Sequence, residues 1–434
     1  MLRHFLILAL RNIKRKATFS ILNIAGFSIG LSACFVVMLY VFQETSYERG
    51  FAQHNDTYRI YTKFLNASFL ATSSINLRDA LIDQPEIEDA TGVGKLSPLK
   101  ELEVRGSTFN TVGYLTVDDS FLKVFNFDLL YGDAQTALAS PNALVLSVVE
   151  AERLFGRKDV VGEVVRFNKE EVLITGVLKP TLFKTHIQFN ALLTQKKSPF
   201  NNKSWVSLSA YTYAVLNPNI SEDQLDARLD YIMKDHIFPG LLEALPIRDG
   251  YTFEEWEQSA SNIRNYAQPI DEIYLASDLS GEWSEGGDRK TVVAFAIVAC
   301  FILIISCANF INLTTAKASD RAKEIGIKKV LGFRRTLLIQ QLIFEAILVT
   351  LIAGVFSFGL TELALKGVNE LFPDFISISL IEFPQIIAVL VVFVLVIGCL
   401  SACYPAFYLS SFKTTALLKG QKVKGFKGAS GANK

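Results

Sequence analysis

Four long runs of apolar residues, none of which contains lysine or arginine, constrain this chain more than any other feature. They cover residues 17–42, 291–316, 337–361 and 385–412. A helix needs about 20 apolar residues to cross the ~30 Å hydrocarbon core of a membrane, and each run approaches or exceeds that length. Soluble cores rarely use four such runs, so we expect four transmembrane helices rather than buried helices of a soluble protein.

The first run follows a basic segment, as the apolar core of a secretory signal peptide also does. It is longer than the 7–15 residues typical of such a core, and no small-residue cleavage motif ends it. We therefore expect this run to stay in the protein as a membrane anchor.

Charge is segregated along the chain, although 43 basic and 43 acidic side chains cancel overall. Residues 1–16 carry five positive charges and no negative ones, and residues 317–335 carry seven positive and two negative. The segment after Phe412 carries six lysines and no acid, whereas residues 43–289 carry 23 basic and 36 acidic side chains. Because positively charged loops stay in the cytoplasm, we expect both termini and the 317–335 loop inside and residues 43–289 outside.

These patterns predict a polytopic α-helical protein of the inner membrane, with four transmembrane helices and a large extracytoplasmic α+β domain inserted between helices 1 and 2. The predicted order is a basic cytoplasmic N-terminus (1–16), helix 1 (17–42), the extracytoplasmic domain (43–289), helix 2 (291–316), a basic cytoplasmic loop or helix (317–336), helix 3 (337–361), a short extracytoplasmic loop (362–384), helix 4 (385–412) and a basic cytoplasmic tail (413–434).

The inserted domain alternates short strand signals with helix signals, which favours an α+β fold. Strands are predicted at Tyr58–Tyr61, Thr111–Val117, Ala143–Ser147, Gly162–Phe167, Val172–Leu178 and Tyr211–Leu216. Ser147 and Ser221 each begin a capping-box pattern that predicts the start of a helix. All five cysteines lie in the apolar runs, so the inserted domain is expected to fold without disulfides.

Sequence signals for catalysis or cofactor binding are incomplete. The segment Gly92–Lys95 resembles part of a phosphate-binding loop, but position 89 is Asp89 rather than glycine and Leu96 replaces the magnesium-binding Ser or Thr. The four histidines have no cysteine or carboxylate at metal-ligand spacing. We therefore expect no metal, no cofactor, no catalytic residues and no nucleic-acid partner.

Three consecutive motifs carry a family resemblance. They are Cys307–Ala316 (CANFINLTTA), Arg321–Gly332 (RAKEIGIKKVLG) and Gln340–Glu345 (QQLIFE). In this order and at these places, they resemble the FtsX/MacB-like permeases of ABC transporters. Further matches to the family, in the style of its Bacteroidota members, are Val117–Phe125, Leu129–Asp133 and Ile174–Leu178 in an extracytoplasmic MacB-like core domain, and Tyr404–Ala406 with Leu417–Gly420 in the closing segment.

The chain departs from the family pattern in three respects. The stretch Tyr47–Phe51 is less regular than the family's usual pattern after the first helix. Phe333 stands where many relatives have a small residue, and many relatives are about twice as long, with a second four-helix half. The chain is thus either a natural half-size subunit or a truncated longer permease, and the sequence leaves both alternatives open.

The resemblance implies a permease subunit without its own ATPase activity. A separate cytoplasmic ABC ATPase would bind the loop between helices 2 and 3, and ATP-driven movement would reach the outside domain by mechanotransmission. The work would be export or extraction of a drug, peptide or lipoprotein. Expected partners are the ATPase, a second copy or a second permease, membrane lipids, and an extracytoplasmic adaptor or outer-membrane protein. The alternative is a non-transporting regulator of extracytoplasmic cell-wall enzymes.

The resemblance also indicates which residues would couple to the ATPase. They are Arg321, Lys323, Glu324, Ile325, Gly326, Ile327, Lys328, Lys329 and Gly332. Charged members would project into a groove of the partner, and Ile325, Val330 and Leu331 would add apolar contacts. Gly326 would permit close backbone approach. From charge alone, the basic residues could equally anchor the loop at anionic lipid headgroups.

Polar residues within the apolar runs form a second group of candidates. Glu345 is an acid inside the third run, where burial is costly and a partner is expected, either a loop Lys or Arg or Asn309 or Asn312. A purely packing role for Glu345 remains the alternative. The two asparagines are expected to bond across helices rather than to bind substrate. Gly26 and Gly30, four residues apart, suit close helix packing such as a dimer seam.

Overall fold

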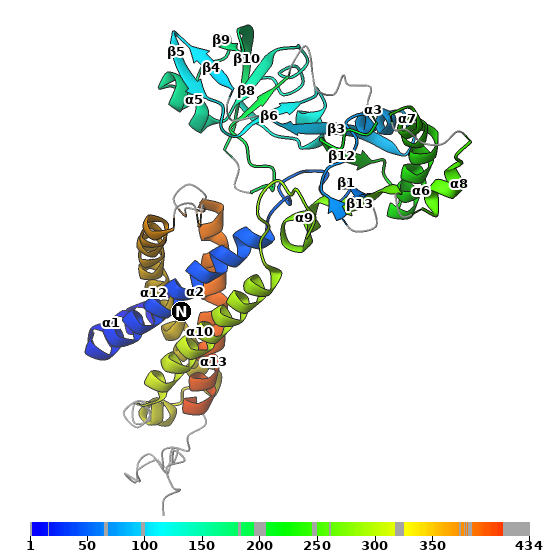
Figure 1. The fold of residues 1–434 in the computed structure, drawn as a ribbon. Coiled ribbons are helices and arrows are strands. Elements are labelled where there is room, and N and C mark those ends of the chain that lie inside the picture. The colour runs from blue at the N-terminus through cyan, green and yellow to red at the C-terminus, as the bar shows by residue number, and fades with distance from the viewer. Residues whose placement is uncertain are drawn as a thin grey trace, which may run out of the picture. The chain divides into compact units, whose positions relative to one another are not determined.

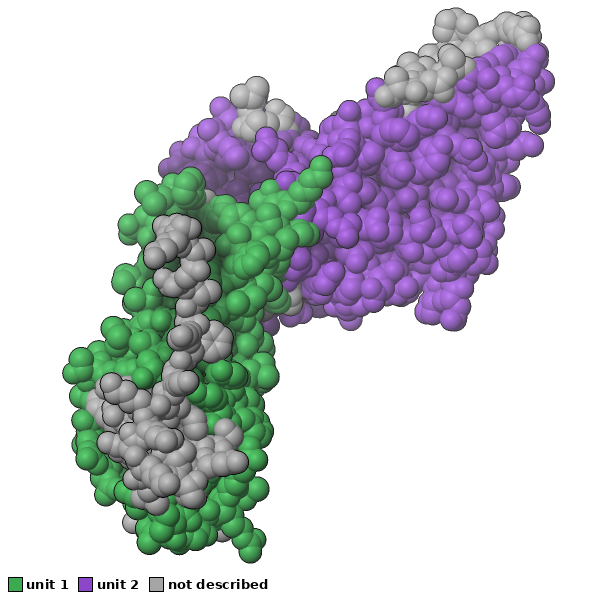
Figure 2. All heavy atoms as spheres, turned by 90° about the horizontal axis from the view of Figure 1, so that it is seen from below, with its two compact units in different colours: residues 1–43, 290–434 green, residues 44–289 purple. Residues whose placement is uncertain are grey.

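The structure is a computed structural model that describes residues 2–15, 17–64, 68–96, 100–180, 184–194, 205–244, 250–259, 262–316, 325–372, 375, 376, 378, 380 and 384–410. The chain forms two compact units (Figure 2). The helical unit comprises Met1–Gln43 with Lys290–Lys434, and the sheet unit comprises Glu44–Arg289. The sheet unit is therefore inserted into the helical unit after its first long apolar helix.

Long helices build the helical unit (Figure 1). They are α1 (Leu2–Arg15), α2 (Ala17–Thr45), α10 (Arg289–Ala316), α12 (Arg335–Leu371) and α13 (Pro384–Ser410). Four of these, all except α1, are long and apolar enough to cross a membrane. Helix α12 continues ten residues beyond the predicted run 337–361, so part of the segment expected as a loop (362–384) is helical.

Helix α1 was not expected as a helix, because residues 2–15 were interpreted only as a basic N-terminal segment. Basic and apolar residues alternate along it with helical spacing, and basic residues occupy its last turn. Ala9 is buried and the helix packs against α12. The first residues of the chain therefore form part of the bundle.

Helices α2 and α10 approach closely because small residues line their contact. A Cβ atom on Gly30 would lie 1.9 Å from the Ser306 hydroxyl oxygen, and one on Gly26 would lie 3.2 Å from Asn309 Nδ2. Phe27 packs on Phe310 with ring centroids 5.4 Å apart. The glycine spacing thus serves a helix–helix contact within one chain, as small residues commonly do in membranes.

One 13-stranded mixed sheet organises the sheet unit, with the strand path β13-β1-β12-β3-β6-β11-β8-β10-β9-β4-β5. The strands on this path are β1 (Thr57–Phe64), β3 (Ile87–Lys95), β4 (Glu101–Val104), β5 (Ser107–Asn110), β6 (Tyr114–Val117), β8 (Ala143–Leu146), β9 (Val164–Phe167), β10 (Glu170–Leu178), β11 (Ala191–Leu193), β12 (Tyr211–Leu216) and β13 (Ile263–Pro269). In addition β2 (Ser68–Leu70) pairs with β1, and β7 (Leu129–Gly132) pairs with β10.

Short helices cover the sheet. They are α3 (Leu77–Ile82), α4 (Phe121–Val124), α5 (Val148–Phe155), α6 (Glu222–Ile232), the π-helical turn η2 (Met233–Ile237), α7 (Phe238–Ala244), α8 (Phe253–Glu257) and α9 (Ile270–Ala276). Three apolar clusters result. One lies under α4 and α9, one under α3, α6 and α7, and one between α5 and strands β8–β10.

The six strands predicted from the sequence each overlap an observed strand. Ser221 forms the predicted capping box with Gln224 at the start of α6. At Ser147 only half of the box forms, because the Glu150 carboxylate instead accepts hydrogen bonds from Tyr114 and Arg153. The segment Gly92–Lys95 lies in strand β3, so it is not a phosphate-binding loop.

The chain segment that leaves the sheet unit is fixed by a buried arginine on β1. The Arg59 side chain is fully buried and donates to both carboxylate oxygens of Glu282, at 2.5 and 2.8 Å. It also donates to Gln268 at 2.7 Å and to Ser277 at 2.9 Å. The segment from Ser277 to Gly287 is thereby tied to the sheet before the chain enters α10.

Candidate coupling surface and membrane cavity

The described part of the coupling element is a short helix at residues 325–330 that precedes α12. It ends in a Schellman motif, in which the Gly332 amide donates to the Lys329 carbonyl and the Phe333 amide donates to the Lys328 carbonyl. Gly332 has a left-handed φ of 87°, which explains why glycine occupies this position. The candidate residues Arg321, Lys323 and Glu324 lie outside the described residues.

This helix is fixed to the helical unit on one side. Ile325 is buried in a cluster with Leu338 and Leu409. Lys328 Nζ donates to Gln341 Oε1 at 3.1 Å, and Lys329 Nζ donates to the Ser410 carbonyl at 2.7 Å. These three side chains therefore hold the helix in place against α12 and α13. Gly326 is buried as well.

The opposite side of the same helix presents apolar side chains to the outside. Ile327 is 59% exposed, Val330 64% and Leu331 72%. Phe333 follows directly and is 45% exposed. Of the three apolar residues expected to meet a partner, Val330 and Leu331 are accessible, whereas Ile325 points into the chain. Ile327 extends the exposed surface, and we call Ile327, Val330, Leu331 and Phe333 the coupling surface.

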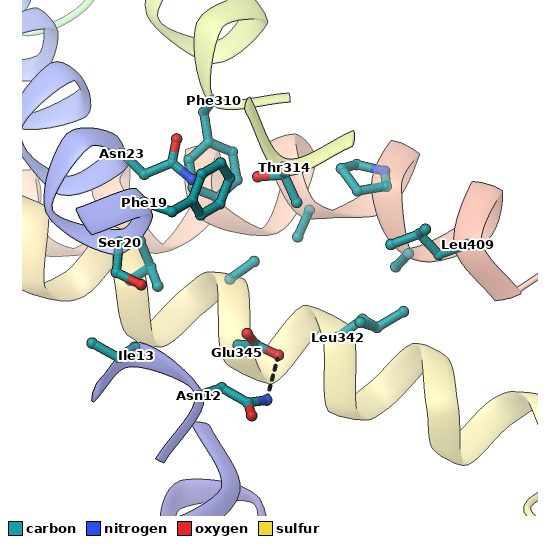
Figure 3. A pocket seen from close by; sticks show the side chains of 15 residues that line it. Asn12, Ile13, Phe19, Ser20, Asn23, Phe310, Thr314, Leu342, Glu345 and Leu409 are labelled. Carbon is teal, nitrogen blue, oxygen red and sulfur yellow. Dashed lines mark hydrogen bonds between the residues drawn. The ribbon is translucent and has the colours of Figure 1, made fainter. Parts of the chain in front are cut away.

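Glu345 lies on α12 beside a small cavity whose lining is mainly apolar but includes several polar side chains (Figure 3). The cavity has a volume of about 40 Å³, and its lining includes Asn12, Ser20, Asn23 and Thr314. Asn12 Nδ2 donates to Glu345 Oε2 at 3.5 Å. A buried water needs roughly 10–15 Å³ of such volume, so the cavity has room for more than one. The Asn23 amide oxygen is buried without a partner among the described residues.

The cavity gathers polar groups from several helices. Figure 3 shows Asn12 from α1 approaching Glu345 from α12, with Asn23 from α2 and Thr314 from α10 nearby. Pro405 of α13 also lines it. The hydrogen-bond partner on α1 was not among those expected from the sequence, because α1 itself was not predicted.

Asn309 and Asn312 lie on α10, away from this cavity lining, and both are exposed on the chain's own surface. Asn309 borders Gly26 of α2. Neither amide side chain hydrogen-bonds to another described residue, so the expected bond across helices is not formed within the described part of this chain.

No group of three or more His, Cys, Asp or Glu residues within the described ranges is placed to hold a metal ion. The polar side chains in the cavity lining are one carboxylate with amides and hydroxyls, and the coupling surface is apolar. Chemically, these features suit helix packing and partner binding.

Two family matches cover most of the chain. Residues 20–232 match the MacB-like periplasmic core domain, and residues 296–414 match the FtsX-like permease C-terminal region. The first match begins within α2, and the second covers α10, the coupling surface, α12 and α13. The chain belongs to the FtsX/MacB-like permeases of ABC transporters.

Relatives of this FtsX/MacB-like permease include macrolide export ATP-binding/permease proteins. MacB 2 of Aeromonas hydrophila is 23% identical over 292 residues, which is 65% of this chain and 39% of that protein. MacB of Neisseria gonorrhoeae is 22% identical over 316 residues, which is 69% of this chain and 44% of that protein. The chain thus spans about two fifths of the length of these curated relatives.

A solved domain of a putative permease protein from Porphyromonas gingivalis is also similar to this chain. It has a TM-score of 0.40 and 21% identity, and the match covers 50% of this chain and 92% of that domain. With its four apolar helices and its MacB-like core domain, the permease is a multi-pass protein of the inner membrane.

Proposed function

We propose that this permease couples a separate cytoplasmic ABC ATPase to movements of its sheet unit, which lies outside the cytoplasm. Both termini and the 317–335 loop would be cytoplasmic, as their positive charge favours. The work would be export or extraction of a drug, a peptide or a lipoprotein. ATP hydrolysis would occur in the partner subunit.

The coupling surface is the observation that carries this proposal. Val330 and Leu331 are large apolar residues that stay exposed on a short helix anchored by Ile325, Lys328 and Lys329. A rigidly held helix with an exposed apolar side fits insertion into a groove of a partner. Exposed apolar patches with polar neighbours commonly mark such interaction sites. Arg321, Lys323 and Glu324, with Gly326 and Gly332 shaping the backbone, complete the proposed contact.

Affinity purification of the tagged full chain from its native membrane, followed by mass spectrometry, tests the proposal. We expect an ABC ATPase in stoichiometric amount with the wild-type chain and its loss with a Val330→Glu, Leu331→Glu double variant. Val149→Glu is the matched control, because Val149 is as exposed as Leu331 (72%) but lies in the sheet unit. Equal recovery of ATPase with the double variant would refute the coupling assignment. Recovery of a cell-wall hydrolase instead of substrate would favour the regulator alternative.

We further propose that α10 meets a second permease, either another copy or a related chain. Only 17% of its apolar window is buried within the chain, against 39% for each of the other three spans. Phe301, Ile304 and Ile305 are exposed on it, and Asn309 and Asn312 are exposed near its end. An amide in hydrocarbon gains stability from a partner across a helix interface, so an unpaired Asn312 favours a second helix at this place.

Cross-linking tests this contact. Cys300 is itself exposed on α10, so the test uses a variant whose native cysteines are replaced by serine. In it, a cysteine at position 312 should form a dimer with its copy in native membranes when an oxidant is added, whereas a cysteine at exposed position 355 on α12 should not. Monomer alone at position 312 would contradict the homodimer and would leave a second, different permease as the expected neighbour.

A further inference from the structure

The sheet unit holds a buried histidine, His186, whose polar groups are all engaged. Its backbone amide donates to the Glu48 carboxylate, and its ring Nδ1 lies 2.8 Å from the same carboxylate. Its ring Nε2 lies 2.7 Å from the Tyr213 hydroxyl, and its carbonyl accepts from the Ser284 hydroxyl at 3.3 Å. The His186 and Glu48 side chains are 3% and 0% exposed.

The protonation states follow from the partners. Burial raises the pKa of Tyr213 well above its ordinary value, so the phenol keeps its proton and can donate to Nε2 of His186. Nδ1 of His186 then carries the ring proton and donates to Glu48. In this tautomer, assigned from the hydrogen-bond network, every polar atom of His186 has a suitable partner.

Glu48 belongs to the segment through which the chain enters the sheet unit. It follows the end of α2 by three residues and has a left-handed φ of 64°, which L-residues disfavour. Its amide donates to the Lys184 carbonyl at 3.1 Å, and its carboxylate also accepts from Thr185 at 2.9 Å. The unfavourable backbone conformation is thus held by contacts with residues 184–186.

Ser284 belongs to the segment through which the chain leaves the sheet unit. The neighbouring Trp283 indole donates to the Gln188 carbonyl at 3.3 Å, two residues from His186. Tyr211, next but one to Tyr213 on β12, donates to the Gly281 carbonyl at 2.6 Å. The two segments that join the sheet unit to the membrane helices therefore meet the same short stretch, residues 184–188, and the same strand.

We propose that His186 is the positioning residue of a clamp that fixes both connecting segments to the sheet and carries displacement of the membrane helices into it. We define the clamp as Glu48, His186, Tyr213 and Ser284. Its role in transmission rests on the proposed function, whereas the clamp as a structural device does not. The His186 ring joins the entry segment to the sheet through Glu48 and Tyr213, and its backbone carbonyl holds the exit segment through Ser284. Loss of the ring therefore affects the entry connection, and loss of the Ser284 hydroxyl affects the exit connection.

Hydrogen–deuterium exchange of the full chain in nanodiscs tests the clamp. In His186→Phe, which loses both ring nitrogens but keeps the backbone carbonyl that Ser284 binds, we expect exchange at least tenfold faster in segment 46–52 and unchanged exchange in segment 280–287. Glu48→Gln should accelerate only the first segment, and Ser284→Ala only the second. His236→Phe is the matched control, because His236 is a partly exposed histidine that stacks on Trp205 elsewhere in the sheet unit.

The possible results distinguish failure of the clamp from failure of the proposed function. Unchanged exchange in segment 46–52 in a folded His186→Phe, or in segment 280–287 in a folded Ser284→Ala, would overturn the clamp. If His186→Phe does not fold, unchanged exchange in both folded single variants, Glu48→Gln and Ser284→Ala, would overturn it equally. With the ATPase bound, ATP should alter exchange in the sheet unit of the wild type, and His186→Phe should lose this change while ATPase binding is kept. Failure of the wild type to bind an ATPase would refute the proposed function and leave the clamp result intact.

Discussion

Replacing Glu282 by glutamine should destabilise the sheet unit substantially, because it leaves the Arg59 charge buried without its counter-ion. The Arg59 side chain is fully buried, and that of Glu282 is 18% exposed. Breaking a buried ion pair by removing one partner typically costs about 3–5 kcal/mol. Gln268 and Ser277 still accept from the guanidinium, so we expect the low end, about 3 kcal/mol.

Thermal unfolding of the full chain in detergent measures this loss selectively. The three tryptophans of the chain, Trp205, Trp256 and Trp283, all lie in the sheet unit, so intrinsic fluorescence follows that unit alone. In a domain of this size, each kcal/mol of lost unfolding free energy lowers the Tm by roughly 2 °C, so we expect the Tm of Glu282→Gln to fall by about 6 °C. Glu285→Gln is the matched control, since Glu285 is exposed and lies three residues away.

The pH dependence gives the same prediction an independent check. Burial raises the pKa of Glu282, but hydrogen bonding and the charge of Arg59 outweigh burial and hold the pKa below its ordinary value. The pair therefore stabilises fully above the unfolded pKa of about 4.3, and this stability is lost as pH falls through the lowered folded pKa. The Tm difference between wild type and Glu282→Gln should be full at pH 7 and shrink below about pH 4. A difference under 1 °C at pH 7 would refute the reasoning.

Three further predictions concern the helical unit. Gly30→Ala should lower the free energy of unfolding by roughly 1–3 kcal/mol and abolish the monodisperse peak in size-exclusion chromatography, because the new Cβ meets Ser306. Adding Ser306→Gly should restore the peak, and Gly359→Ala should have no effect because the space around Gly359 is open. Gly332→Ala should lower the free energy of unfolding by about 1 kcal/mol, because alanine disfavours the left-handed φ of this position, and should reduce the ATPase recovered in purification. Gly332→Asn should change neither quantity, because asparagine adopts this φ more readily. Glu345→Gln should keep the thermal stability of the wild type in nanodiscs, because the amide oxygen can still accept the hydrogen bond from Asn12 on α1. Glu345→Leu should be less stable, because it leaves the Asn12 amide without this acceptor.

The four apolar helices and the family were accessible from the sequence because both depend on local features. Apolar runs without lysine or arginine need no knowledge of distant contacts, and a motif such as Arg321–Gly332 is contiguous. The strands that were predicted, such as Tyr211–Leu216, are rich in Val, Tyr and Leu. Strand β3 was missed because Gly92 and Gly94 give it the composition of a loop, although neighbouring strands hold it in the sheet.

Long-range pairings could not be predicted, because they depend on the tertiary fold. Nothing near Glu48 in the sequence indicates that its partner lies 138 residues away at His186. The inward orientation of Ile325 likewise depends on α13, which follows much later in the chain. A signal for α1 was present in the helical spacing of its apolar and basic residues, and the partner of Glu345 on α1 could have been considered from it.

The continuous strand path also sets the scale of movement at the far end of the sheet. Residues 184–188 lead directly into β11, and five strand-to-strand steps separate β11 from the edge strand β5. At about 4.8 Å per step this is an arm of roughly 24 Å, so a rigid rotation of about 10° at its base moves β5 by roughly 4 Å. A distance probe placed on β5 would therefore detect small rotations that a probe beside β11 would barely register.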